Sequence, residues 1–300
     1  MARVAKKTKT ISLVSVVAAA TGIALALSSS AAAAQPTVGL GSTANYAVLA
    51  GSGITNTGST TVSGTAGGDL GSSPTGTFTG DTGVTTTGTK FTAVNAQTTA
   101  AKVDLVTAYD DAAVRTPVNT VTADLGGQTL TAGVYNSASS LGLTGTLTLD
   151  AENNPDAVFI FQAGSTLITE TSSTVALIRG AQPCNVFWQV GSSATFKTTS
   201  NFTGHVFALE SITAQNNATF HGQLLARNGE VTLESNTIVN DACSTVVPTE
   251  TASASASPTT TNGGGLPNTD SPDLSTPLFV GFALALVGSV VLFIRRKKLS

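Results

Sequence analysis

The two histidines are the first residues to consider for chemistry. His205 and His221 stand near the Gly204 and Gly222 turns of two similar segments, so they could be neighbours in the folded chain and hold a metal. No third His or Cys accompanies them, and two surface histidines are the simpler interpretation. We therefore expect no metal site and no cofactor.

Acidic side chains and catalytic motifs give no stronger signal. Asp110 and Asp111 lie in a helical pattern, whereas Asp150 and Glu152 lie in a turn, and both pairs are more typical of solvated surface than of a weak calcium site. The sequence has no Gly-x-Ser-x-Gly nucleophile elbow and no phosphate-binding loop. These features predict a protein that is not an enzyme.

Four similar segments between residues 157 and 233 predict the main architecture. They begin at Val158, Val186, Val206 and Leu224, and each continues into a Ser/Thr/Gly-rich run and a second short apolar strand. A unit that recurs at this period, with no helical pattern between its strands, is typical of a solenoid. We expect its coils to stack as parallel strands.

The pattern within the strands predicts which sides are covered. In the segments that start at Ser193 and Glu230, apolar residues alternate with Thr, Lys or Glu, so one face of each strand should meet solvent. The runs 158–161 and 186–188 are apolar at successive positions, which indicates burial on both faces. Another element must therefore lie against that side of the stack.

A long helix is the candidate for this cover. Residues 93–115 contain no Gly or Pro, Thr92 can cap their start, and Pro117 soon ends them. A helix of this length is about 35 Å long, the height of about seven stacked strands. The expected buried stripe recurs at helical spacing and consists of Ala93, Ala96, Ala100, Val103, Val106, Tyr109 and Ala113. The glycine-rich residues 37–90 before it read as short strands and turns, hence as more coils.

Both ends of the chain carry targeting features. Residues 1–34 combine basic residues, an apolar run and Ala32-Ala33-Ala34, the plan of a signal peptide. Residues 278–294 form an uncharged apolar span that is followed by basic residues 295–298, which should remain in the cytoplasm. We therefore expect an extracellular protein, held at first by a transmembrane segment.

The pentapeptide before that span resembles the cell-wall sorting signal of Gram-positive surface proteins. It consists of Leu266, Pro267, Asn268, Thr269 and Asp270. The resemblance implies that a sortase-type transpeptidase cuts after Thr269 and joins it to peptidoglycan. The usual fifth residue is Gly, and Asp270 stands here instead, so an uncut membrane anchor is the alternative.

Composition and cysteines describe the exported part. Residues 244–265 are nearly all Ser, Thr, Ala, Pro, Gly and Asn, which predicts a flexible linker. Residues 35–269 hold 6 Lys and Arg against 15 Asp and Glu, a formal charge of −9 that makes nucleic acid an unfavourable partner. Cys184 and Cys243 are the only cysteines, and outside the cell a disulfide between them is expected; two buried thiols are the alternative.

Long motifs resemble the microbial ice-binding-protein family over residues 37–243. They occur in the family's order and are Asn45-Tyr-Ala-Val-Leu-Ala-Gly-Ser, Gly68-Asp-Leu-Gly, Asp124-Leu-Gly-Gly with Gly133-Val-Tyr, Leu141-Gly-Leu-Thr-Gly-Thr-Leu-Thr-Leu-Asp150, Asp156-Ala-Val-Phe-Ile-Phe-Gln, Cys184-Asn-Val-Phe-Trp-Gln-Val-Gly-Ser and Leu225-Ala-Arg-Asn-Gly. The resemblance implies a mainly β fold, a discontinuous parallel β-solenoid (β-helix) of triangular cross-section with one long α-helix packed alongside. The expected domains are thus a signal peptide (1–34), the solenoid (35–243), the linker (244–265) and the sorting signal (266–300).

The resemblance also implies a flat ice-binding face of Thr, Ser, Ala and Asn. Some family members carry Thr-Ala/Gly-x-Thr/Asn on that face, and four tetrads fit: those at 57–60, 79–82, 82–85 and 213–216. They give as candidates Thr57, Thr60, Thr79, Thr82, Thr85, Thr213 and Asn216. Because the chain is rich in Thr, the alternative interpretation is that these tetrads arise by chance and are ordinary turn and strand-surface residues. Protruding Lys197, Glu170, Glu210 and Glu234 count against a broad ice face.

Two functions without catalysis follow from these features. The first is an anchored protein whose partner is the surface of an ice crystal. The second is a wall-displayed adhesin or structural module that contacts surface glycans or other cells. A regular Thr/Ser/Ala face across at least three coils would favour ice binding, and charge-interrupted strands would favour adhesion.

Overall fold

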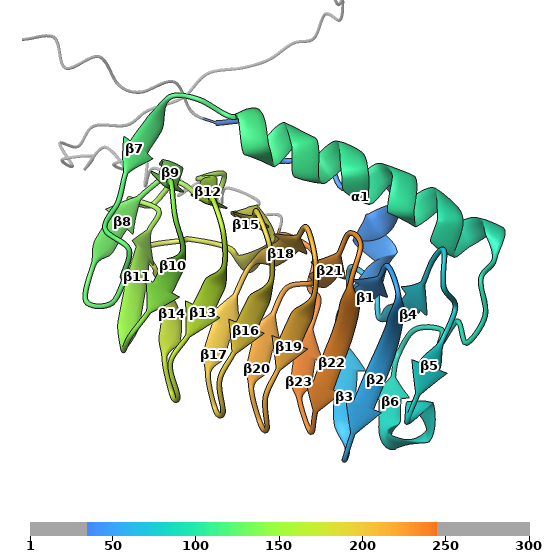
Figure 1. The fold of residues 1–300 in the computed structure, drawn as a ribbon. Coiled ribbons are helices and arrows are strands. Elements are labelled where there is room, and N and C mark those ends of the chain that lie inside the picture. Colours follow the sequence, from blue (N-terminus) through green and yellow to red (C-terminus); the bar gives the residue numbers. More distant parts are fainter. Residues whose placement is uncertain (1–34, 245–300) are drawn as a thin grey trace, which may run out of the picture. The chain divides into compact units, whose positions relative to one another are not determined.

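The computed structural model describes residues 35–244, and Figure 1 shows their fold. The expected signal peptide, the sorting signal and all of the linker beyond Ser244 lie outside the described residues, as does the apolar span 278–294. Within residues 35–244 no helix is long and apolar enough to cross a membrane.

Three parallel sheets form the solenoid, and each full coil contributes one strand to each sheet (Figure 1). Sheet A consists, in spatial order, of β4 (Asp69–Ser72), β1 (Tyr46–Ala50), β21 (Leu224–Ala226), β18 (His205–Ala208), β15 (Val186–Val190), β12 (Phe159–Ala163), β9 (Gly133–Ser137) and β7 (Val118–Thr120). Sheet B consists of β10 (Leu141–Leu143), β13 (Leu167–Thr169), β16 (Ala194–Phe196), β19 (Ile212–Ala214), β22 (Glu230–Glu234), β2 (Gly53–Thr57) and β5 (Phe78–Thr79).

Sheet C completes the triangle. It consists of β6 (Val84–Thr86), β3 (Thr60–Ser63), β23 (Thr237–Val239), β20 (Thr219–His221), β17 (Asn201–Thr203), β14 (Thr174–Ile178), β11 (Thr146–Asp150) and β8 (Thr129–Thr131). Three short 3-10 helices lie at corners and turns: η1 (Gly41–Asn45), η2 (Asp81–Gly83) and η3 (Pro183–Asn185). The predicted parallel β-solenoid is thus confirmed.

The stack is discontinuous in sequence. β1, β2 and β3 pair with β21, β22 and β23 of the last coil, for example Val48 with Leu224 and Thr61 with Thr237. The chain therefore builds the coils at one end first, crosses to the other end through the helix, and returns coil by coil to the first ones (Figure 1). We call this junction between early and late coils the seam.

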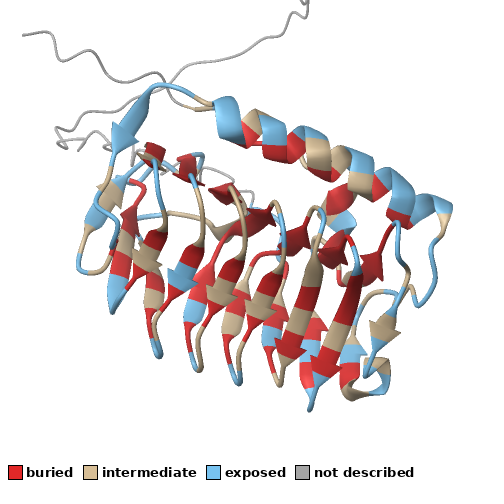
Figure 2. Cartoon of the chain, viewed as in Figure 1, coloured by how far each residue is buried: buried red, intermediate tan, exposed pale blue. Residues whose placement is uncertain are grey.

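Apolar side chains fill the interior of the triangle. In most strands of sheets B and C buried and less buried positions alternate (Figure 2). Inward residues such as Val62, Phe220 and Leu233 are almost fully buried. Aromatic rings stack from coil to coil, with the ring centroids of Phe161 and Trp188 4.0 Å apart. This regular core holds the outer faces of the sheets in register.

Helix α1 (Ala96–Val114) covers sheet A (Figure 1). A second apolar cluster lies between them and joins helix residues Leu105 and Ala108 to outward residues of sheet A such as Ile160, Phe187 and Leu225. The expected cover for the doubly buried strands is confirmed. At 19 residues and about 28 Å the helix is shorter than we predicted.

The start and the buried stripe of the helix differ from the sequence prediction. Asn95, not Thr92, is the N-cap, and it forms a capping box with Thr98. The residues that the helix buries are Thr98, Ala101, Leu105, Ala108, Tyr109 and Ala112, so only Tyr109 of the predicted stripe is correct. Because alanines occur on several sides of this helix, their spacing does not select one face.

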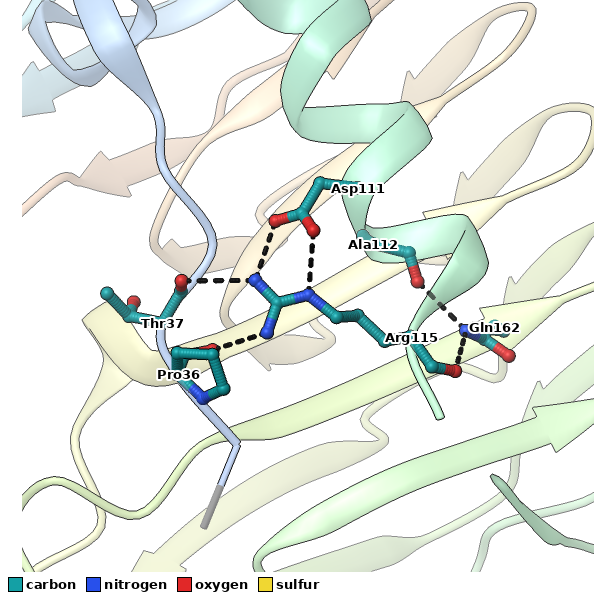
Figure 3. A network of polar contacts seen from close by, with 6 residues as sticks. All are labelled: Pro36, Thr37, Asp111, Ala112, Arg115 and Gln162. Carbon is teal, nitrogen blue, oxygen red and sulfur yellow. Dashed lines mark hydrogen bonds and ion pairs between the residues drawn. The ribbon is translucent and has the colours of Figure 1, made fainter. Parts of the chain in front are cut away.

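Polar contacts hold the end of the helix (Figure 3). Gln162 of β12 donates from Nε2 to the carbonyl oxygens of Ala112, at 2.9 Å, and Arg115, at 3.2 Å. Arg115 pairs with Asp111 through two nitrogens and also donates to the Pro36 carbonyl oxygen at 2.9 Å. These bonds satisfy helix-end carbonyls and attach the first described residues to the helix.

A half-buried lysine makes a second attachment. The Lys102 Nζ donates to the carbonyl oxygens of Ala226 and Arg227, at 2.6 and 2.7 Å. The pKa of Lys102 is lowered to about 7, chiefly by burial and secondly by the positive charge of Arg227. The middle of the helix is thereby fixed to the corner between β21 and β22.

The two cysteines form the expected disulfide. Cys184 lies in η3, just before β15, and Cys243 follows the last strand, β23. Their Cα atoms are 5.4 Å apart, and 59 positions separate them in sequence. The bond therefore links a middle coil to the end of the described chain.

Candidate functional site

Sheets B and C present their outer faces to solvent, whereas α1 covers sheet A (Figures 1 and 2). A surface that binds through regular spacing must therefore lie on sheet B, on sheet C or on both. Neighbouring strands are about 4.8 Å apart, so residues in register form a row with that spacing along the stack.

Sheet C carries an outward row of hydroxyl side chains. Strand pairing places one residue from each of seven strands in line, and all but one of the seven are threonines. In order along the stack they are Thr85, Thr61, Thr237, Thr219, Asn201, Thr174 and Thr146. In six of these strands the next residue points into the core and is buried, so the row itself faces outward. We call this set the sheet C threonine row.

The residues around this row carry no permanent charge. Two positions further along the strands lie Ser63, Val239, His221, Ala176 and Thr148, together with Thr203, which is buried and donates its hydroxyl to the Val175 carbonyl oxygen. His221 is the one titratable side chain among the outward residues of both rows. Within these two rows the surface consists of methyl, hydroxyl, amide and imidazole groups without carboxylates or ammonium groups, and the Asp150–Arg179 ion pair lies beyond them, at the ends of β11 and β14.

Sheet B carries a shorter row with charged neighbours. Its central outward residues are, in order, Thr79, Thr55, Thr232, Thr213 and Thr195, after which Ile168 and Gly142 end the pattern. We call the five threonines the sheet B threonine row. Two positions further on lie Glu234 and Lys197, and the Lys197 Nζ pairs with the Glu170 carboxylate at 2.8 Å. Three of the four predicted charges thus flank the sheet B row, and Glu210 lies between β18 and β19.

The sequence-predicted residues fall in several places. Thr79 and Thr213 belong to the sheet B row, and Thr85 belongs to the sheet C row. Thr57 and Asn216 are exposed at or just after the ends of sheet B strands, and Thr82 is exposed in η2. The four tetrads therefore do not form one surface.

Thr60 does not belong to any outer face. Its side chain is 1% exposed, donates to the Asn56 Oδ1 at 2.6 Å, and accepts from the Asn236 backbone N–H at 3.1 Å. Its hydroxyl is used inside the corner between sheets B and C. The tetrad motif names Thr60 as a candidate but not its neighbour Thr61, which lies in the sheet C row.

Most residues of the sheet C threonine row are not among the candidates that the four tetrads give. Asn201, Thr219 and Thr237 recur at equal spacing in three successive coils, and this equal spacing is the signal that could have identified them. A four-residue motif within one coil cannot detect such a row, because its members come from different coils.

The two histidines occupy different environments. His221 is half-buried on sheet C and pairs with Thr203, whereas His205 is buried in sheet A beside Phe187, with ring centroids 5.3 Å apart. The interpretation of two surface histidines is therefore wrong for His205, and burial lowers the pKa of its imidazole to about 4. Among residues 35–244 no three His, Cys, Asp or Glu side chains are grouped as metal ligands would be.

Comparison with known proteins shows the family of the chain. The family described as "Ice-binding-like" matches residues 48–239, which are most of the solenoid. The chain belongs to this family. An ice-binding protein of Nostoc sp. (strain HG1) is 42% identical over 208 residues, covering 69% of this chain and 75% of that protein.

Solved structures of similar proteins share the fold. A crystal structure of an ice-binding protein from an Antarctic biological consortium has a TM-score of 0.67 at 45% identity, and the match covers 70% of this chain and 93% of that one. The ice-binding protein of the Antarctic ascomycete Antarctomyces psychrotrophicus has a TM-score of 0.64 at 39% identity, covering 68% and 98%. These relatives are named as ice-binding proteins and not as enzymes.

Proposed function

We propose that this family member binds ice, mainly through the sheet C threonine row, with a smaller contribution from the sheet B row. The seven-strand uncharged row on sheet C is the observation that carries the proposal. The names of the relatives support the ligand.

Regular spacing is what such a surface offers to ice. The core and the parallel ladders hold each hydroxyl and methyl group in place, so water ordered over them can continue into the crystal lattice without a large further loss of entropy. Charged groups bind their own water more tightly and in a different geometry. For this reason we rank sheet C above sheet B, where Glu234, Lys197 and Glu170 border the row.

The first test uses ice itself. Residues 35–244 are labelled fluorescently, and an ice hemisphere is grown slowly in their solution. We expect the folded domain to enter the ice and a control protein of similar size to be excluded. Exclusion of a domain that circular dichroism shows to be folded would reject ice binding.

Tyrosine substitutions then locate the face. Thr219→Tyr places a bulky ring in the middle of the sheet C row, and Thr213→Tyr does the same on sheet B. Thr107→Tyr, on the exposed side of α1, is the matched control. We expect Thr219→Tyr to remove most of the incorporation, Thr213→Tyr to reduce it less, and Thr107→Tyr to leave it unchanged.

The reverse order would change only the face. If Thr213→Tyr abolished incorporation while Thr219→Tyr did not, ice binding would stand and sheet B would be its surface. The argument from flanking charge would then be wrong.

We also propose that the domain is displayed outside a Gram-positive cell. The signal-peptide pattern in residues 1–34, the linker and the sorting pattern Leu266, Pro267, Asn268, Thr269 and Asp270 support this location. The implied partners are a sortase-type transpeptidase and peptidoglycan, with residues 278–294 in the membrane before processing. A tethered ice binder would position the cell at ice, whereas a free one would act on the surrounding solution.

Cell fractionation tests the anchor. We expect the protein in the wall fraction, released by peptidoglycan hydrolase at mixed sizes, and deletion of residues 266–270 should move it to the membrane. Release by detergent alone in the unaltered chain would show an uncut membrane anchor.

An adhesin without ice affinity is the second candidate function. The ion pair of Lys197 with Glu170, and Glu234 beside it, make sheet B an uneven polar surface of the kind that can contact glycans or proteins. Exclusion of the folded domain from ice, together with binding of the displayed protein to cells or glycans, would establish this alternative.

A further inference from the structure

The segment after the last strand runs back across the solenoid. Residues 240–244, which we call the C-terminal strap, leave β23 and reach η3, which precedes β15 two coils away. Asp241 accepts from the Thr65 backbone N–H at 3.0 Å, and the backbone N–H of Ser244 donates to the Gln182 Oε1 at 2.7 Å. Between these contacts the Cys184–Cys243 disulfide fixes the strap covalently.

This arrangement determines where a pull on the C-terminus would act. Without the disulfide, tension applied beyond Ser244 reaches Asn240 and then β23, a strand of three residues. With the disulfide, the same tension passes from Cys243 directly into Cys184. All strands from β15 to β23 lie within the 59-position loop that the bond closes, and they are bypassed.

The bypassed strands include the seam. β23 pairs with β20 on one side and with β3 on the other, and Ile238 at its centre is fully buried. Peeling β23 would open the core and separate the late coils from the early ones. Hydrogen bonds of a short parallel strand break one after another under such a load, whereas a covalent bond does not.

We propose that the Cys184–Cys243 disulfide is the mechanical attachment point of this domain, carrying tension from the C-terminal continuation into the middle of the solenoid. The inference goes beyond ice binding and does not require it. It gives the disulfide a second role besides stability. A protein that is held at its C-terminus and pulled through a ligand on its outer faces would experience this tension.

Single-molecule force measurement tests the proposal. All described residues belong to one compact unit, so residues 35–244 can be held by handles at their two ends. We compare the oxidised domain with the Cys184→Ser/Cys243→Ser variant. We expect the variant to show an early low-force step that the oxidised domain lacks. Its fully extended length should also be greater by about 200 Å, the reach of the freed loop.

A second pulling geometry separates mechanics from general stability. A handle on a clickable residue at exposed position 107 and one at residue 35 load the domain without passing through the strap. We expect disulfide removal to lower the first rupture force at least twofold when load enters through the strap, and much less in the control geometry. Equal losses in both geometries, or the same first rupture force with and without the disulfide, would overturn the proposal. Ice incorporation of the same samples is measured separately, so a failure of either idea is seen on its own.

Discussion

Thr60 and Thr61 are neighbours in β3, but their side chains point to opposite sides of sheet C. The Thr60 hydroxyl bonds to Asn56 and Asn236 in the interior, and the Thr61 hydroxyl lies in the outward row. Two residues of one type therefore have separate consequences when they are changed.

Substitution of each threonine by valine should separate stability from ice affinity. Thr60→Val leaves the Asn56 Oδ1 and the Asn236 N–H without their partner, so we expect a loss of about 2 kcal/mol in unfolding free energy. Thr61→Val should leave stability within about 0.5 kcal/mol and lower ice incorporation. Urea unfolding and the ice hemisphere measure the two quantities. A stable Thr60→Val domain would contradict the assigned hydrogen bonds.

His205 makes stability depend on pH. Its pKa is lowered from 6.5 to about 4 in the folded domain, so the unfolded chain takes up the proton first as the solution becomes acidic. The contribution of neutral His205 to the unfolding free energy is fully present above pH 6.5 and is lost as the pH falls from 6.5 towards 4. Between about pH 8 and pH 5 the expected loss is about 2 kcal/mol.

A variant isolates this contribution. His205→Phe keeps an aromatic ring beside Phe187 but cannot be protonated. Urea unfolding of both proteins at the two pH values gives the difference, in which the titration of Lys102 and of the carboxylates cancels. We expect the wild type to lose about 2 kcal/mol more than His205→Phe on acidification. Parallel losses would show that His205 does not titrate as its burial implies.

At the scale of elements, the helix is held by alanines on one face. Ala101, Ala108 and Ala112 are fully buried against sheet A, whereas Ala100 is exposed. Small side chains let the helix backbone approach the sheet closely, so there is no room for a larger group.

A matched pair of leucine substitutions tests the buried face. Ala108→Leu should overpack the contact and cost about 1–3 kcal/mol of unfolding free energy, because the core cannot expand freely. Ala100→Leu, on the exposed side, should cost less than about 0.5 kcal/mol. Thermal unfolding by circular dichroism compares them. Equal melting temperatures of the two variants would mean that the helix faces sheet A differently.

Strand type was predictable because its signal is local. Alternation in a segment such as that starting at Ser193, and uninterrupted apolar runs such as 186–188, distinguish half-buried from doubly buried strands. The existence of the helix was equally clear from a stretch without Gly or Pro. The buried face of the helix was not predictable, because exposed Ala100 and buried Ala101 have the same side chain, and only the contact with sheet A distinguishes them.

The candidate site was less predictable, because it depends on pairing between distant residues. Thr61 joins the sheet C row only because β3 stacks on β23, although 176 positions separate Thr61 from Thr237. No local pattern specifies this seam. The outward direction of Thr61 and the inward direction of Thr60 likewise follow from which side of sheet C contains the core.

At the scale of the whole molecule, the seam requires late coils to find early ones after the rest of the stack has formed. Most strand pairings join successive coils, whereas the seam pairings join residues such as Thr61 and Thr237, so closing the long intervening chain costs entropy that the seam must offset. The disulfide reduces part of this cost, because it restricts the unfolded chain between Cys184 and Cys243.

Reduction of the disulfide should therefore destabilise the entire domain without altering its faces. For a closed loop of 59 positions, chain entropy gives a loss of about 4 kcal/mol in unfolding free energy. Urea unfolding of the oxidised domain and of the Cys184→Ser/Cys243→Ser variant measures it. Near 0 °C, where the variant should still be folded, its ice incorporation should equal that of the wild type, because the sheet C threonine row contains no strap residue. Lost incorporation in a folded variant would mean that the strap helps to shape sheet C.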